Sequence, residues 1–197
     1  MALKTVRNAC VLQDNALDIR VSDQIEQLDE LIKQESGGET FFDRTFITEG
    51  METLFKEGIA RLAGRSSSGV FHLKQAMGGG KTHLLVGFGL LARNPALRKK
   101  IIPHVSHIES FGNARVAAFN GRNHPNDFLW GEIAKQLGKG EMFAQFWNAG
   151  PKAPSEQDWL KAFEGDSPTL ILLDELPPYF HYYATQQVGN GTVADVA

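Results

Sequence analysis

Three consecutive glycines stand directly before a lysine and a threonine in the run KQAMGGGKTHLL, residues 74–85. Just ahead of it, VFHL at 70–73 has the apolar character of a buried parallel strand. From Lys81 onward apolar residues recur at helical spacing until Asn94 and Pro95 end the pattern. A glycine-rich turn between a strand and a helix lets backbone amides converge on an anion. The run therefore predicts a phosphate-binding loop, and the alternative is a glycine-rich linker followed by Lys-Thr by chance.

Each residue type in this run suits a phosphate site. Glycines let the main chain approach a ligand closely, and the three concerned are Gly78, Gly79 and Gly80. Lys81 is expected to reach the β- and γ-phosphates as a mobile point charge, and the Thr82 hydroxyl to ligate Mg²⁺. His83 either faces the phosphates or covers the first helical turn, and we include it among the binding candidates.

A second run carries complementary chemistry. The stretch TLILLDEL, residues 169–176, is the strongest strand candidate in the chain and ends in two acids. An aspartate at the tip of a buried strand can hold Mg²⁺, which is the role expected of Asp174. The neighbouring Glu175 can polarise the water that attacks a γ-phosphate. The alternative is a core strand followed by an ordinary acidic turn.

The rest of the chain alternates helical and strand patterns. One more strand is predicted over residues 114–120, between the two motif runs. Helices are predicted over residues 16–38, 51–64 with Thr48 as N-cap, 126–138, 141–148 and 155–165, the last with a capping box. The order of strand, helix, strand, helices and strand predicts an α/β fold, a parallel sheet with helices on both faces.

Composition limits the class of protein. The chain has 197 residues, is 42% hydrophobic and carries a formal charge of −3, as expected of one soluble domain that is not basic overall. Its single cysteine, Cys10, excludes an internal disulfide framework, and no apolar run is long enough to span a membrane. We therefore expect a cytoplasmic protein.

Two smaller groups of residues give further expectations. Arg98, Lys99 and Lys100 are interpreted as a solvated helix end and not as a nucleic-acid site. Phe41, Phe42 and Phe46 are interpreted as core residues. His104 and His107 have no acidic or cysteine partners at metal-site spacing.

The glycine run resembles the Walker A motif of P-loop nucleotidases, with Gln75 where the first glycine of that motif stands. LILLDE resembles Walker B. The strand predicted between these two motifs makes the chain similar to the additional-strand branch of P-loop proteins. This branch includes the AAA+ ATPases and DNA motor proteins. In that branch a fourth strand lies between the two motif strands and a fifth flanks the first. Neither is recognisable before residue 197, so the resemblance implies an incomplete N-terminal portion of the P-loop fold.

Three stretches narrow the resemblance further: FFDRTFITEGMETLFKEGIARLAG, GGGKTHLL and LILLDELPPYF. They resemble large AAA-like ATPases encoded beside DNA methyltransferases in bacterial phage-defence loci. The resemblance implies an N-terminal helical segment at 1–40, a lead-in segment and helix at 41–68, and the first part of the ATPase core at 69–197. It also places Arg44 to Thr48 near the adenine. It implies ATP and Mg²⁺ as ligands, DNA and a methyltransferase or other defence proteins as partners, a homo-oligomer in full-length form, and no membrane.

Two functions remain open on the sequence. The first is an ATPase whose hydrolysis drives conformational change, with Lys81 and Glu175 as the catalytic residues. The second is a nucleotide-gated scaffold or switch that hydrolyses little ATP and recruits a DNA-modifying partner, and the Gln75 departure is compatible with it. For residues 1–197 alone we expect weak nucleotide binding and little turnover.

Overall fold

The computed structural model describes residue 28 and residues 38–74, 79–123, 128–148, 153–184, 187–188 and 191–192. The helix predicted over residues 16–38 lies outside the described residues apart from its end and Leu28, which is helical and fully buried in the main core. No helix in these ranges is long and apolar enough to cross a membrane.

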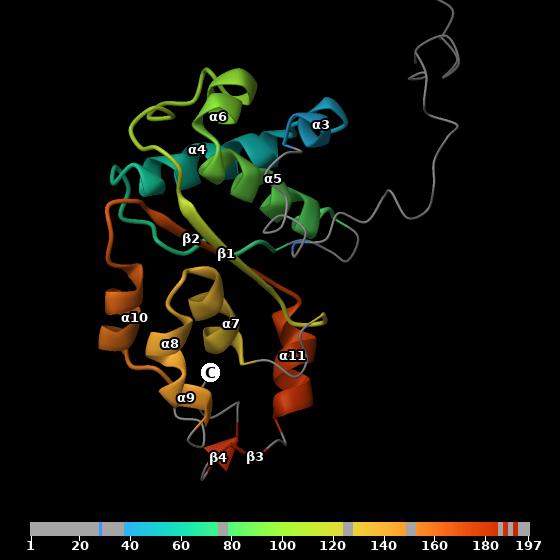
Figure 1. Ribbon diagram of the computed structural model, residues 1–197. Coiled ribbons are helices and arrows are strands. Elements are labelled where there is room, and N and C mark those ends of the chain that lie inside the picture. The colour runs from blue at the N-terminus through green and yellow to red at the C-terminus, as the bar shows by residue number, and fades with distance from the viewer. Residues whose placement is uncertain are drawn as a thin grey trace, which may run out of the picture.

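Two parallel strands form the centre of the molecule (Figure 1). β1 (Arg115–Asn120) pairs with β2 (Thr169–Asp174) from Arg115↔Thr169 to Asn120↔Asp174. Because successive side chains of a strand point to opposite faces, the two strands contribute to two different cores. Ala118 and Leu172 pack on one face, whereas Ala117 and Ile171 pack on the other.

Helices cover the first face of the sheet and form the upper group in Figure 1. They are α3 (Gly38–Asp43), α4 (Glu49–Leu62), α5 (Lys81–Arg93) and α6 (Pro95–Ile101). Thr48 caps α4 by accepting a hydrogen bond from the backbone of Met51, as its position in the sequence predicts. Asn94 caps α6 in the same way, and Pro95 stands in the first turn, where its missing N–H costs nothing.

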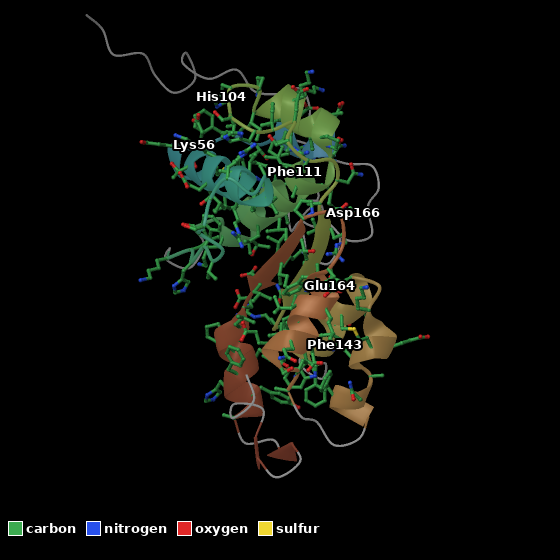
Figure 2. All side chains as sticks on the ribbon, turned by 90° about the vertical axis from the view of Figure 1, so that its left-hand side faces the viewer. Lys56, His104, Phe111, Phe143, Glu164 and Asp166 are labelled. Atoms are coloured by element: carbon green, nitrogen blue, oxygen red, sulfur yellow. The ribbon has the colours of Figure 1, made fainter. Side chains whose placement is uncertain are left out.

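The second face is covered by α7 (Leu129–Gln136) and α10 (Glu156–Phe163). The predicted capping box is present, because Ser155 and Asp158 exchange side-chain and backbone hydrogen bonds. The aromatic stretch at 141–148 divides into α8 (Gly140–Phe143) and α9 (Gln145–Asn148). Phe143 belongs to an aromatic core below the strands, and Phe111 lies in the upper group (Figure 2).

The chain after β2 forms α11 (Leu176–Tyr183), with two prolines in its first turn, and then a short antiparallel pair, β3 (Gln187–Val188) and β4 (Gly191–Thr192). The strand predicted to reach residue 176 therefore ends at Asp174. A parallel sheet with helices on both faces is confirmed for β1 and β2.

The strand predicted at residues 70–73 is wrong, since residues 65–74 have no regular secondary structure. Val70 is 89% exposed and Phe71 36% exposed. A strand is stable only when its backbone groups pair with a neighbour, and no strand in the described ranges pairs with this segment.

Two further expectations are wrong. Phe46 is 85% exposed in the loop between α3 and α4, although Phe41 and Phe42 are buried as predicted. Arg98 is fully buried instead of solvated, because its guanidinium finds backbone carbonyls inside the protein; Lys99 and Lys100 are exposed as expected.

Candidate functional site

The N-terminus of α5 contains the lysine and threonine of the glycine run. Gly80 immediately precedes the helix in the left-handed conformation, with φ of 76°, which glycine adopts without steric cost. A Cβ built on Gly80 would have no atom of the described residues within 4 Å, so among these residues the space beside the turn is open. Gly79 and Gly80 are exposed, and Lys81 and Thr82 are half-buried in the first turn of α5. Gly78, like Gln75, lies outside the described residues.

The two motif runs meet at one hydrogen bond. Thr82 Oγ1 donates to Asp174 Oδ2 at 2.5 Å, although the residues are 92 positions apart. The other carboxylate oxygen of Asp174 accepts from the backbone N–H of Glu175 at 3.0 Å. Asp174 is buried, with 8% of its surface exposed, so its carboxylate is fixed by these contacts. The structure therefore joins the first turn of α5 to the carboxyl end of β2.

Glu175 begins the turn that follows β2. Its backbone is left-handed, with φ of 53° and ψ of 37°, which is uncommon for a residue with a side chain. This conformation ends the strand and starts α11 within one residue. The Glu175 side chain is 39% exposed, and its Oε2 lies 3.5 Å from Nη2 of Arg122. A carboxylate that is partly open to water thus stands next to the buried Asp174.

The carboxyl end of β1 supplies residues that the sequence analysis did not include. Asn120 is the register partner of Asp174, and Gly121 donates its backbone N–H to Asp174 O at 3.0 Å. Arg122 contacts Glu175, as described above. The sequence signal for these residues is the polar stretch NGRN, 120–123, at the end of a predicted strand. Adjacent parallel strands place their carboxyl ends at one edge of the sheet, so such a stretch is a candidate for the site.

His83 is directed at the lead-in segment. Its ring stacks on Phe41 with centroids 4.4 Å apart, and its Nε2 lies 2.9 Å from Thr45 Oγ1. Thr45 also donates to the carbonyl of Phe41 at 2.7 Å. The segment at 44–48 is thus attached to the first turn of α5 through His83. Spacing in the sequence does not reveal this contact, because the partners are 38 positions apart.

The donor set has the oxygen chemistry that magnesium prefers. Within the described ranges no group of three or more His, Cys, Asp or Glu side chains could hold a metal ion by itself. Mg²⁺, however, is usually bound by one or two carboxylates together with waters and substrate phosphates. Thr82 and Asp174 offer a hydroxyl and a carboxylate in contact, beside an open turn of backbone. These residues fit such an ion when it arrives with a phosphate ligand.

The fold and this edge define a mixed α/β protein with a two-stranded parallel sheet and a polar site where the strands end. Residues 5–116 match the DUF499 N-terminal domain family, and this is more than half of the chain. The chain belongs to this family. No curated protein and no solved structure matches it.

Proposed function

We propose that the chain is the N-terminal portion of a P-loop ATPase, which binds ATP with Mg²⁺ and hydrolyses it to drive a conformational change. The observation that carries the proposal is the hydrogen bond of Thr82 to Asp174. If the glycine run were a linker and the acids an ordinary turn, no contact between the two would be expected. A magnesium–triphosphate site, in contrast, requires a hydroxyl and an acid at one point.

Each residue of the site has a task in this proposal. The amides of Gly79 and Gly80, with those at the start of α5, bind phosphate oxygens, favoured by the positive end of the helix. Lys81 neutralises charge on the terminal phosphates, and Thr82 and Asp174 hold the metal ion. When bound, Mg²⁺ would supply further neutralisation of the charge on the phosphates.

Glu175 is the proposed general base. Its side chain is partly exposed and adjacent to Asp174, so a water molecule can reach it. The backbone turn at Glu175 matters here because it directs this side chain differently from that of Asp174. Asp174 is buried and hydrogen-bonded through both oxygens, which suits it to holding an ion and not to accepting a proton.

Two substitutions test the proposal. Lys81→Met should weaken binding of a fluorescent ATP analogue by at least about tenfold, because a hydrogen bond to a charged group contributes roughly 1.5–3 kcal/mol. Glu175→Gln should bind the analogue normally and lower ATP turnover by about 10²-fold or more. Lys56→Met and Glu164→Gln are the matched controls, since both side chains are exposed.

Binding can be measured on residues 1–197, and turnover in the longer protein of which we propose it is part. Wild-type binding and turnover in both variants would refute the proposal. Binding that depends on Lys81 together with negligible wild-type turnover would favour the scaffold, which recruits a DNA-modifying partner. A link to DNA, to a methyltransferase and to phage defence is proposed from the sequence resemblance alone, and stimulation of turnover by DNA would support it.

A further inference from the structure

The turn after β1 is attached to the turn after β2 at three points. Gly121 donates its N–H to Asp174 O at 3.0 Å. A Cβ built on Gly121 would lie 2.5 Å from the carbonyl oxygen of Glu175 and 2.5 Å from Cβ of Tyr179, so only glycine fits there without movement. Beyond Gly121, Arg122 reaches Glu175 with its guanidinium. The two turns therefore form one unit around Glu175.

Asn120 fixes the backbone of the turn that contains Arg122. Its Oδ1 accepts hydrogen bonds from the backbone N–H of Arg122 at 2.9 Å and from that of Asn123 at 3.3 Å. Asparagine makes such turns because its side chain can replace a backbone acceptor. Asn120 is itself buried, with 9% of its surface exposed, so the turn is fixed to the end of β1. The backbone position from which the Arg122 side chain extends is thus set by the fold.

We propose that Arg122 is a positioning residue for Glu175, which holds the carboxylate in an ion pair and restrains it from acting as a base. This inference rests on the proposed function, in which Glu175 is the general base of ATP hydrolysis. A carboxylate oxygen that faces a guanidinium is occupied by that partner, so it is less available to contact the attacking water. The Nη2–Oε2 distance of 3.5 Å places the two groups in contact without a short hydrogen bond.

The exposure of the pair makes this restraint easy to release. The Arg122 side chain is 67% exposed and that of Glu175 39% exposed, so water screens their attraction. Release frees Glu175 without any change of the backbone, which Gly121 keeps in place.

Steady-state ATP hydrolysis by the longer protein tests this role. Arg122→Ala should raise kcat about two- to fivefold, the range expected from the strength of an exposed ion pair, and should leave KM unchanged. Arg122→Lys keeps the charge and should stay near the wild-type kcat. Arg65→Ala is the control, since Arg65 is an exposed arginine on a loop. Should Arg122→Ala fail to fold, Arg122→Gln keeps the polar side chain without its charge and should show the same rise.

Combining substitutions separates this inference from the proposed function. In the Glu175→Gln background, Arg122→Ala should have no effect on kcat, because the restrained group has gone. A kcat that falls or stays constant in Arg122→Ala, while Glu175→Gln remains inactive, would overturn the role of Arg122 and leave the ATPase proposal standing. Wild-type hydrolysis by Glu175→Gln would instead overturn the proposed base itself.

Discussion

The side-chain amide of Gln136 on α7 is paired with the backbone of Ala118 on β1. Ala118 N–H donates to Gln136 Oε1 at 2.7 Å, and Gln136 Nε2 donates to Ala118 O at 2.9 Å. The amide therefore satisfies Ala118 on the edge of β1 that faces away from β2, in the way that a further strand would. Any strand added to this sheet is expected to join at β2, which agrees with the strand order that the sequence resemblance implies.

Gln136→Leu should lower the free energy of unfolding by about 1–3 kcal/mol. Leucine is similar in size but leaves an N–H and a C=O of Ala118 without their partner, and unsatisfied backbone groups are costly when they are removed from water. Urea unfolding followed by circular dichroism measures the change. Lys135→Met, on an exposed neighbour, should change stability by less than about 0.5 kcal/mol. Equal stabilities of the two variants would contradict this account of the β1 edge.

Thr82→Val should remove most of the magnesium dependence of nucleotide binding, because valine has the same shape as threonine but no oxygen for a metal ion. Thr82→Ser retains the hydroxyl that contacts Asp174 and should keep that dependence. Titration of a fluorescent ATP analogue with and without Mg²⁺ measures both variants. Valine and serine variants with the same magnesium dependence would show that Thr82 has only a structural contact with Asp174.

Two glycines of α4 should respond in opposite ways to alanine. A Cβ on Gly58 would lie 2.2 Å from Cζ of the buried Phe88, whereas on Gly50 the nearest atom is 4.0 Å away. Gly58→Ala should therefore destabilise the protein by about 1–3 kcal/mol through overpacking. Gly50→Ala should be neutral or stabilise it by up to about 1 kcal/mol through helix propensity. Melting temperatures that shift in the same direction would contradict the close packing of α4 on α5.

Local signals allowed much of the fold to be predicted. The starts of α4 and α10 follow from N-terminal capping residues, Thr48 for one and the Ser155–Asp158 pair for the other. The sequence predicts those residues of the site that belong to the two motif runs, 74–85 and 169–176. Thr82 and Asp174 meet although residues 65–74 form no strand, because α5 packs on the sheet with its first turn at the carboxyl end of β2.

The wrong predictions concern contacts between distant residues. Residues 70–73 have the composition of a strand, but a strand exists only with a partner, and composition does not specify one. Arg98 has the sequence context of a solvated helix end, yet carbonyls from the loop at 102–114 surround it. The contribution of Arg122 to the site was missed because it depends on the turn made by Asn120.

Arg98 is expected to be the most sensitive polar residue for stability. Its guanidinium donates to five backbone carbonyls, those of Leu91, Ala92, Ile108, Phe111 and Gly112. Two of these acceptors lie in the last turn of α5, where carbonyls lack helical partners and a positive charge is favoured. Its carbon Cζ also lies 4.0 Å from the centroid of the Phe111 ring. Burial lowers the pKa of Arg98, and these carbonyls compensate the buried cation.

Arg98→Met should therefore lower the free energy of unfolding by about 2–5 kcal/mol, since it removes the donor that the carbonyls of α5 and of the loop at 102–114 share. Arg98→Lys should also be destabilising, because an ammonium group has three donors and lacks the planar fork that reaches both segments. Lys99→Met is the matched control on the next residue. Lys99 is exposed and paired only with the exposed Glu109 among the described residues, so its loss should change stability by less than about 0.5 kcal/mol. Chemical denaturation of the three variants measures these differences, and an Arg98→Met variant as stable as Lys99→Met would show that the buried guanidinium does not hold α5 to the loop.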